Sequence, residues 1–320
     1  MQNKVIVIAG PTASGKTRLG IELAKICGGE IVSADSMQVY RRMDIGTAKA
    51  DAAEQAQAVH HMLDVAEPDE NYSVARYLED AGKICDDILS RGRLPIIVGG
   101  TGLYIDSLIS GRDFADNQED MSLRRELDEQ FEQIGGEEML KLLASFDPER
   151  AAKLHHSDKR RIIRAIEIYK LSGITATEHD RLTRERPPKY DAARIVLNYK
   201  NRADLYERID RRVDQMETLG LFQEVEELLN EGLSPACTAM QAIGYKEAVL
   251  AVRGDISRRE AIGLIQQNSR RYAKRQLTWF KRWEDTHWIE WDSSPDFEAA
   301  LLSSTKFLLS KGYHDVANTL

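Results

Sequence analysis

The sequence contains few cysteines and no long apolar run. Its three cysteines, Cys27, Cys85 and Cys237, lie far apart and form no Cys-x-x-Cys pair, which argues against a disulfide framework or a zinc site. We expect them to be buried free thiols. No apolar run approaches the roughly 20 residues that span a membrane, and the N-terminal residues lead into an apolar segment without a signal-peptide cleavage site. These absences predict a cytoplasmic protein with no membrane contact.

A carboxylate is missing where a motor or signalling ATPase would carry one. Residues 94–98 form a short apolar run that leads into Gly99-Gly100-Thr101, with no Asp directly after it. Such an Asp would mark the Walker B strand that helps to hold Mg²⁺ during ATP hydrolysis. Its absence argues against ATP hydrolysis as the main activity.

The chain contains fewer basic than acidic residues. With 44 basic and 52 acidic residues the formal net charge is −8, which argues against a protein that coats nucleic acid nonspecifically. Basic residues nevertheless gather in three segments, residues 159–164, 181–189 and 270–282. These segments fit either one specific polyanionic partner or ordinary solvated helix faces, and charge alone favours the second interpretation.

Residues 10–17 read Gly-x-x-x-x-Gly-Lys-Thr, directly after an apolar run and directly before an amphipathic stretch. Strand, glycine-rich turn and helix in this order are the setting of a phosphate-binding P-loop. The glycines let backbone N–H groups face phosphate oxygens, the helix N-terminus adds a positive dipole end, and the lysine adds a charge. The threonine hydroxyl suits Mg²⁺. The predicted phosphate-binding residues are Gly10, Pro11, Thr12, Ala13, Ser14, Gly15, Lys16 and Thr17.

Polar residues also follow the second predicted strand. Asp35, Ser36 and Gln38 come directly after the apolar residues 30–34, and the carboxyl ends of strands in an open α/β sheet face the ligand crevice. A carboxylate beside a P-loop can hold Mg²⁺ through water or take a proton from a nucleophile. A plain helix N-cap at Asp35 or Ser36 fits the spacing equally well. Both interpretations stay open on spacing alone.

The order of predicted elements indicates an α/β protein with a helical insertion. At 320 residues the chain exceeds the size at which one core keeps growing, so a second domain or a large insertion is expected. Strand signals disappear between about residues 112 and 195, where charged amphipathic helices replace them. We predict a P-loop NTPase-like core with a parallel sheet flanked by helices. It is formed by residues 1–112 and by the mainly helical residues 195–320, with an all-helical insertion domain at residues 113–194.

Several further motifs follow one another along the chain. They are Ser33-Ala-Asp35-Ser-Met-Gln38-Val-Tyr40, Met43-Asp-Ile-Gly-Thr-Ala-Lys49, Val98-Gly-Gly-Thr101, Asp158 with Arg161 and Arg164-Ala-Ile-Glu167, Ile243-Gly-Tyr245, and Lys274-Arg275-Gln276-Leu-Thr-Trp279. Together with the P-loop they resemble the bacterial tRNA dimethylallyltransferases, from residue 4 to about residue 290. The P-loop is generic, whereas the other motifs in this order are specific. The resemblance implies transfer of a dimethylallyl group from dimethylallyl diphosphate to N6 of the adenosine 3′-adjacent to the anticodon of tRNA, with release of diphosphate.

The resemblance also implies roles for individual residues. Asp35 resembles the general base for the amine proton, and Thr101 resembles a partner that orients the base or the diphosphate. Lys16 and either Arg208 or Arg212, which share one helical face, would neutralise the leaving diphosphate with a Mg²⁺ ion on Thr17. The residues implied or placed at the tRNA are Asp35, Ser36, Met37, Gln38, Thr101, Arg124, Arg160, Arg161, Ile162, Ile163 and Arg164. The implied partners are the anticodon stem-loop of tRNA, at the insertion domain, and dimethylallyl diphosphate, and we expect a monomer.

Alternatives to this function stay open. A nucleotide or small-metabolite kinase shares the P-loop and the missing Walker B acid, and a non-catalytic, nucleotide-gated RNA-binding protein would share the basic segments. The long helical stretch at residues 257–283 carries Trp279, Phe280 and Trp283 beside basic residues. Aromatic residues at helical spacing usually pack in a core, which is favoured here over stacking on RNA.

Overall fold

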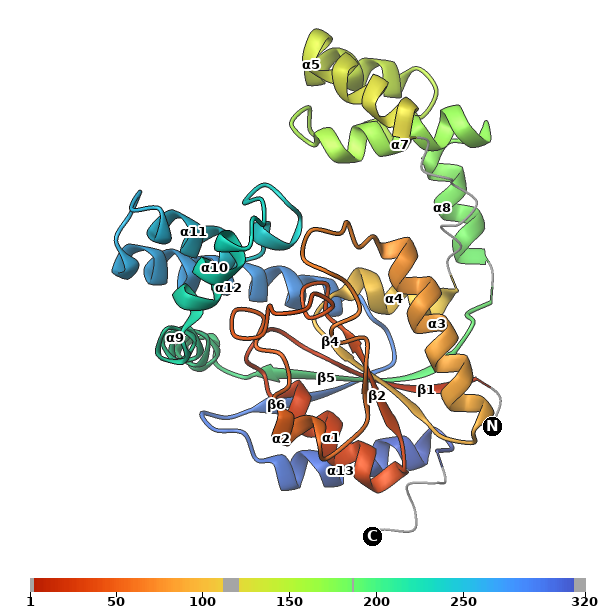
Figure 1. The fold of residues 1–320 in the computed structure, drawn as a ribbon. Coiled ribbons are helices and arrows are strands. Elements are labelled where there is room, and N and C mark those ends of the chain that lie inside the picture. Colours follow the sequence, from red (N-terminus) through yellow and green to blue (C-terminus); the bar gives the residue numbers. More distant parts are fainter. Residues whose placement is uncertain (1–2, 112–120, 186, 314–320) are drawn as a thin grey trace. The chain divides into compact units, whose positions relative to one another are not determined.

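The computed structural model describes residues 3–111, 121–185 and 187–313, which separate into two compact units (Figure 1). One unit, here the α/β unit, comprises Met1–Ile109 and Lys189–Leu320, and the other, the helical unit, comprises Ser110–Pro188. The predicted domain boundary between residues 112 and 113 lies outside the described residues.

A six-stranded parallel sheet forms the centre of the α/β unit. The strand order is β3-β2-β4-β1-β5-β6, with every neighbouring pair parallel. The bounds are β1 Lys4–Ala9, β2 Glu30–Ala34, β3 His60–His61, β4 Pro95–Gly99, β5 Asp191–Tyr199 and β6 Thr286–Trp291. The predicted parallel α/β fold is confirmed, but the prediction missed β3 and β6.

Alternating side chains of the strands build a separate core on each face of the sheet. In β1, Val5 and Val7 join the core covered by α3 (Val74–Ser90) and α4 (Gly102–Ser110), whereas Ile6 and Ile8 join the core covered by α1 (Lys16–Cys27) and α13 (Phe297–Ser310). Because successive side chains of a strand point to opposite faces, a strand covered on both sides must be apolar throughout. This requirement explains the unbroken β-branched run that precedes the glycine-rich turn.

Helices cover both faces of the sheet in the α/β unit. Their bounds are α1 Lys16–Cys27, α2 Ala52–Gln55, α3 Val74–Ser90, α4 Gly102–Ser110, α9 Arg202–Leu219, α10 Leu221–Asn230, a 3₁₀ turn Ala239–Gln241, α11 Tyr245–Val252, α12 Arg258–Phe280 and α13 Phe297–Ser310. The helix predicted at residues 72–90 is confirmed as α3, whose start is capped by the Ser73 side chain. Cys85 is buried in this helix, but Cys27 and Cys237 are partly exposed, so the prediction of three buried thiols is wrong for those two.

The helical unit has a core of its own. Its helices are α5 Met121–Ala144, α6 Pro148–Ala151, α7 Lys159–Ser172 and α8 Ala176–Glu185. α5 bends at Gly135, whose φ of 78° is in the left-handed region that favours glycine. Apolar residues of α5 and α7, among them Leu127, Met139 and Ile166, are fully or almost fully buried against one another. The predicted change from strands to amphipathic helices is confirmed for the described part of the insertion.

The two ends of the helical unit meet at one place. The backbone N–H of Tyr190 donates to the carbonyl of Ile109 over 3.2 Å, at the points where the chain leaves and re-enters the α/β unit. The chain therefore leaves the α/β unit after α4 and re-enters it before β5 at neighbouring positions, and β4 and β5 both pair with β1. Among the described residues of both units, no helix is long and apolar enough to cross a membrane.

Candidate active site at the carboxyl edge of the sheet

Three strands end at the same level of the sheet. Ala9 of β1 and Ala34 of β2 are both paired in register with Gly99 of β4, which lies between these strands. A Cβ atom on Gly99 would lie 2.1 Å from the Ala34 carbonyl oxygen, so this close approach requires glycine. The segments that follow these strands, which carry the predicted site residues, therefore begin side by side. This is the ligand crevice expected for an open α/β sheet.

The P-loop is held in shape by contacts from distant segments. Gly10 and Gly15 have φ values of 152° and 91°, and Ala13 has φ 63°, a conformation uncommon for a residue with a side chain. The indole N–H of Trp291, in β6, donates to the Ser14 carbonyl over 2.9 Å. The Ser14 side chain is fully buried, and among the described residues its Oγ has no hydrogen-bond partner. The predicted strand, loop and helix are confirmed as β1, residues 10–15 and α1.

Lys16 begins α1 and its ammonium folds back over the loop. The Nζ atom donates to the Pro11 carbonyl over 2.7 Å. Burial lowers the pKa of Lys16 to about 7, with a further lowering from the positive charge of Arg212 and an opposing effect from Asp35. These charge interactions indicate that Lys16, Arg212 and Asp35, which come from separate segments of the chain, lie close together.

A cavity of about 410 Å³ opens beside the P-loop. Its wall includes both arginines predicted from α9, which confirms that they share a face. The guanidinium of Arg208 donates to the Ala13 carbonyl over 3.2 Å and that of Arg212 to the Ala48 carbonyl over 3.3 Å. Burial lowers the pKa of Arg212, while Asp35 and Glu54 oppose the shift. The lining residues are Ala13, Ser14, Gly15, Lys16, Thr17, Arg18, Glu54, Arg208, Arg211, Arg212, Gln215 and Phe297.

Asp35 and Thr101 are joined through the turn that starts at Asp35. One carboxylate oxygen of Asp35 accepts the Met37 backbone N–H over 2.9 Å, and the Thr101 hydroxyl oxygen accepts the Ser36 N–H over 3.1 Å. The Thr101 N–H in turn donates to the Ala34 carbonyl over 3.1 Å. Residues 36–39 form turns and no helix follows Asp35, so the helix N-cap interpretation is wrong. The Asp35 carboxylate lies close enough to Lys16 to influence its pKa.

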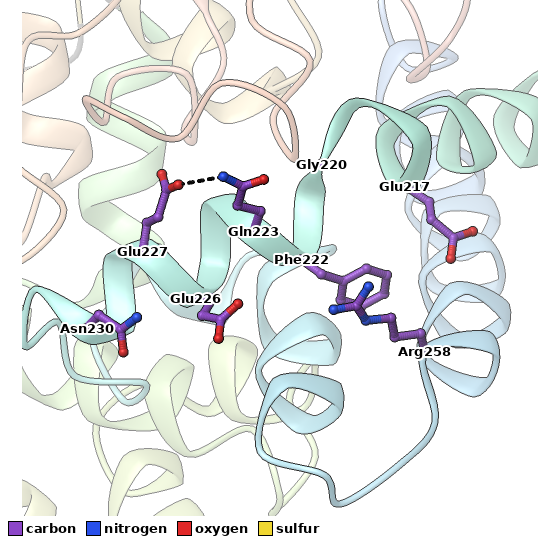
Figure 2. Close-up of a pocket in the computed structure, with 8 residues that line it drawn as sticks. All are labelled: Glu217, Gly220, Phe222, Gln223, Glu226, Glu227, Asn230 and Arg258. Atoms are coloured by element: carbon purple, nitrogen blue, oxygen red, sulfur yellow. Dashed lines mark hydrogen bonds between the residues drawn. The ribbon is translucent and has the colours of Figure 1, made fainter.

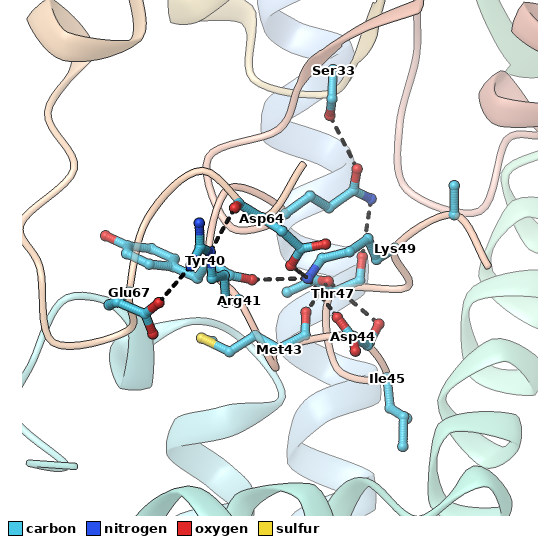
Figure 3. A network of polar contacts seen from close by, with 12 residues as sticks. Ser33, Tyr40, Arg41, Met43, Asp44, Ile45, Thr47, Lys49, Asp64 and Glu67 are labelled. Carbon is cyan, nitrogen blue, oxygen red and sulfur yellow. Dashed lines mark hydrogen bonds and ion pairs between the residues drawn. The ribbon is translucent and has the colours of Figure 1, made fainter. Parts of the chain in front are cut away.

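Gln38 and the motif at residues 43–49 form a polar network behind this turn (Figure 3). The Gln38 amide accepts from the Ser33 hydroxyl and donates to the carbonyls of Thr47 and Ala48. Lys49 has a side chain that is only 3% exposed, and its ammonium contacts the Tyr40 carbonyl, Asp44 and Asp64. The specific Asp-Ile-Gly-Thr-Ala-Lys motif therefore shapes a loop whose Ala48 carbonyl holds Arg212.

The predicted tRNA-contacting residues of the helical unit fall into two classes. Arg160 and Arg161 are exposed in the first turn of α7, and Arg164 is partly exposed and pairs with the buried Glu167 over 2.7 Å. Ile162 and Ile163 are buried in the core of the unit. Their side chains support α7 and are not available to a ligand, and the Ile162 backbone N–H is bonded to the Asp158 carbonyl over 3.0 Å. The predicted Arg124 lies partly exposed on α5.

Two aromatic residues at the end of α12, Trp279 and Phe280, and Trp283 just after it pack within the α/β unit. Phe280 is fully buried, and the indole N–H groups of Trp279 and Trp283 donate to the two carboxylate oxygens of Asp106 over 2.8 and 2.7 Å. The interpretation of these residues as packing residues is confirmed. Sequence reasoning missed Gln276, Trp291 and Phe297 at the P-loop, because each lies far from residues 10–17 along the chain.

A second cavity, of about 490 Å³, lies between α9, α10 and α12 (Figure 2). Arg258 stacks over the Phe222 ring, with the guanidinium carbon 5.1 Å from the ring centroid. Gln223 donates to Glu227 over 2.9 Å, and two further glutamates, Glu217 and Glu226, line the wall. This cavity contains none of the predicted site residues and is strongly acidic. A phosphate ligand therefore fits the P-loop cavity and not this one.

Comparison with known proteins assigns the family. Residues 38–283 match the IPP transferase family, and residues 3–65 match a family described as isopentenyl transferase. The chain belongs to the IPP transferase family. The tRNA dimethylallyltransferase of Acetivibrio thermocellus is 44% identical over 308 residues, which cover 96% of this chain and 98% of that protein. The one from Caldanaerobacter subterraneus is 45% identical over 312 residues, covering 97% and 99%.

Solved IPP transferase structures share the fold. The tRNA isopentenylpyrophosphate transferase from Bacillus halodurans superposes with a TM-score of 0.73 at 39% identity and covers 99% of each chain. A eukaryotic dimethylallyltransferase acting on tRNA superposes with a TM-score of 0.82 at 29% identity, covering 99% of this chain and 80% of that one. The family predicted from the motifs is thereby confirmed.

Proposed function

We propose that this chain transfers a dimethylallyl group from dimethylallyl diphosphate to N6 of the adenosine 3′-adjacent to the anticodon of tRNA. The observation that carries the proposal is that a cavity lined by cationic side chains lies beside the Asp35 carboxylate at the carboxyl edge of the sheet. Lys16 and Arg212 come from the cavity wall, and Asp35 is close enough to shift the pKa values of both. Full-length similarity to tRNA dimethylallyltransferases supports the same reaction.

The cavity supplies what a leaving diphosphate needs. As the bond between the allylic carbon and the diphosphate oxygen breaks, negative charge grows on that oxygen and is shared with the phosphates. Lys16, Arg208 and Arg212 surround the cavity, and the N-terminus of α1 points into it. Fixed cations and backbone dipoles stabilise such developing charge without needing to reorganise. We assign diphosphate binding to these groups and to the P-loop backbone.

Asp35 supplies what the attacking amine needs. The lone pair of adenine N6 forms the new bond to C1 of the dimethylallyl group while the C1–O bond breaks, and the electron pair of that bond leaves with the diphosphate. The nitrogen must then lose one proton, which we assign to the Asp35 carboxylate. Its hydrogen bond from Met37 and the Ser36–Thr101 contact fix its orientation. A positioned base of this kind contributes about 10²–10⁴-fold to the rate.

The donor groups beside the P-loop fit a Mg²⁺ ion. The Thr17 hydroxyl and the Glu54 carboxylate line the same cavity. The described residues contain no cluster of three or more His, Cys, Asp and Glu side chains that would form an all-protein metal site. Mg²⁺ typically uses one or two protein oxygens, with phosphate oxygens and water completing the octahedron. We propose that Thr17 contributes to holding the ion, which supplies additional charge neutralisation for the diphosphate.

The start of α7 supports RNA binding by the helical unit. Arg160 and Arg161 are exposed in the first turn of this helix, whereas the neighbouring Lys159 is already paired with Asp128 and Glu132. The N-cap residue Asp158 makes no side-chain bond to the N–H groups of α7. Cations are unfavourable at a helix N-terminus, where unpaired N–H groups already attract anions. An RNA phosphate would satisfy both features at once. We assign backbone contacts with tRNA to this turn, which position the RNA without reading its sequence.

We propose that the enzyme acts as a monomer. Its substrate, tRNA, supports action in the cytoplasm. The test is incubation with Mg²⁺, dimethylallyl diphosphate and unmodified tRNA, followed by mass spectrometry of the nucleosides. We expect dimethylallyladenosine from this mixture and no phosphorylated product when ATP replaces the prenyl donor. A phosphorylated product with ATP and none with the prenyl donor would establish the kinase alternative.

The Asp35→Ala variant separates an enzyme from a binding protein. The proposed reaction requires that this variant lose prenylation while it still binds tRNA in a filter-binding assay. If the wild-type protein binds tRNA and diphosphate but yields no prenylated nucleoside, the protein is the non-catalytic RNA-binding alternative.

A further inference from the structure

Gln276 connects two parts of the proposed active site that come from different strands. It lies in α12 and is only 5% exposed. Its Oε1 atom accepts the backbone N–H of Thr12 in the P-loop over 2.9 Å. Its Nε2 atom donates to the carbonyl of Gly100, directly before Thr101, over 3.0 Å.

The fit around this amide is tight on the Gly100 side. A Cβ atom on Gly100 would lie 2.1 Å from the Gln276 nitrogen, so the glycine is needed to admit the amide. One turn later on α12, Trp279 packs over Gly102 in the same way, with a Cβ atom there only 2.3 Å from the indole ring. α12 therefore packs closely against the segment between β4 and α4 at Gly100 and at Gly102.

A third residue of α12, Tyr272, lies near Asp35, the proposed general base. Tyr272 lies one turn before Gln276 on α12, and burial together with the negative charge of Asp35 raises its pKa to about 12, while hydrogen bonding with the Thr101 and Gln276 side chains opposes the shift. Thr101 in turn holds the Ser36 N–H. The path from the P-loop to the base thus runs through Thr12, Gln276, the residues 100–101 and the turn at Asp35.

We propose that Gln276 is a positioning residue that sets the P-loop and the Asp35 turn relative to each other. The inference rests on the proposed prenyl transfer, because it concerns how the leaving-group site and the base are aligned. Its amide pairs the partly buried Thr12 N–H and the buried Gly100 carbonyl, and a buried unpaired backbone group disfavours the conformation that buries it. Precise alignment of the reacting groups is worth large rate factors.

The first test measures how Gln276 affects diphosphate binding at the P-loop, without prenyl transfer. Gln276→Met keeps the side-chain length and removes both hydrogen bonds. We expect it to weaken binding of inorganic diphosphate with Mg²⁺ about tenfold by calorimetry, whereas the matched Gln267→Met variant, at an exposed position on the same helix, changes it less than twofold. Equal binding by Gln276→Met and Gln267→Met overturns the proposal. Because this measurement needs no prenyl transfer, it stays informative if the proposed function fails.

The second test measures the coupling between Gln276 and Thr101. Turnover at saturating substrates is measured for Gln276→Met, Thr101→Val and the double variant. If Gln276 acts through the turn that carries Thr101, the losses in kcat are non-additive by at least about fivefold, as expected for residues in one network. A merely structural residue gives losses that multiply, and that result overturns the proposal.

A third variant guards against misfolding. Gln276→Glu retains an acceptor for the Thr12 N–H and places a carboxylate oxygen against the Gly100 carbonyl. If Gln276→Met shows no thermal unfolding transition, this variant decides the question through turnover. At least about tenfold lower kcat with an unchanged KM for tRNA supports the positioning role, and wild-type kcat overturns it.

Discussion

The α/β unit fixes its polar site residues by hydrogen bonds to backbone groups, whereas the helical unit leaves Arg160 and Arg161 exposed to solvent. Lys16, Arg208 and Arg212 each donate to a backbone carbonyl, and Asp35 accepts from one backbone N–H. Arg160 and Arg161 are exposed in the first turn of α7. Fixed side chains suit a chemical step that depends on precise alignment of the reacting groups. Exposed arginines suit electrostatic attraction of RNA, which tolerates movement of the side chains. The two units should therefore respond differently to substitution.

The largest expected effect on turnover comes from replacing Asp35, the proposed general base. Asp35→Asn keeps the shape of the side chain and removes its ability to take a proton, so kcat should fall about 10²–10⁴-fold. Diphosphate binding should stay within about threefold of wild type, because Asn retains an acceptor for the Met37 N–H. Initial rates of dimethylallyladenosine formation give the answer. Asp51→Asn, at the N-cap of α2, is the matched control, and near-normal turnover by Asp35→Asn would rule out its role as the base.

The next effect concerns the leaving group. Lys16→Gln removes one fixed positive charge from the cavity, and kcat/KM for dimethylallyl diphosphate should fall about 10²–10³-fold. Lys25→Gln removes a charge from the same helix at an exposed position and should leave kcat/KM unchanged. Equal values for both variants would mean that Lys16 does not contact the diphosphate. Steady-state kinetics at pH 7 make the comparison.

A smaller effect is expected on changing pH. Without ligand, the pKa of Lys16 is about 7, far below its ordinary value. A bound diphosphate favours the ammonium form, so above pH 7 binding must take up a proton and the affinity should fall up to about tenfold per pH unit. Calorimetry in two buffers of different protonation enthalpy reports that proton. Because diphosphate itself titrates, the Lys16→Gln variant is the reference, and identical pH profiles would contradict the prediction.

The exposed arginines should show a different pattern. The double variant Arg160→Ala/Arg161→Ala should raise KM for tRNA several-fold at low salt, with kcat nearly unchanged. The slope of log affinity against log salt should fall by about one for each arginine that binds a phosphate in the wild-type protein. Arg181→Ala is the control, since Arg181 is already paired with Glu178 and Glu185. A fall in kcat without a change in the salt slope would place these arginines in the chemistry instead.

The smallest expected effect on turnover comes from the opposite end of β2. Arg91, Arg93 and His61 surround the buried Glu30 carboxylate and lower its pKa to about 2. Because the pKa is lower in the folded state, this stabilisation is complete above about pH 4.5 and is lost as the pH falls towards 2. Glu30→Gln should lower the free energy of unfolding by about 2 kcal/mol at pH 7 and by much less near pH 2. Denaturant titrations measure this, and kcat should not change.

The sequence predicted the elements whose signal is local. The β-branched run before Gly10, the helix after Lys16 and the helical spacing of Arg208 and Arg212 all follow from residues near one another in the chain. β6, Thr-His-Trp-Ile-Glu-Trp, was missed because its alternation is short and its partly exposed residues carry no clear pattern. β3 has only two residues, and its strand character comes from pairing with β2.

The parts of the site that could not be predicted depend on contacts between remote segments. Gln276 is 264 positions away from Thr12, and Trp291 is 277 positions away from Ser14. A motif such as Lys-Arg-Gln-x-Thr-Trp shows that a residue type matters without showing what it contacts. The burial of Ile162 and Ile163, in contrast, follows from the periodicity of α7 and was available from the sequence.

The hydrogen bond between Tyr190 and Ile109 has a consequence for how such a chain can change over time. Because both ends of the helical unit are already neighbours, a tight turn could replace it without moving β4 or β5. Closing a long loop between fixed, adjacent ends costs little more entropy than closing a short one. Insertions and deletions in this part of the chain therefore leave the strand order untouched. Lineages could lengthen, shorten or exchange this segment while they keep the same donor site.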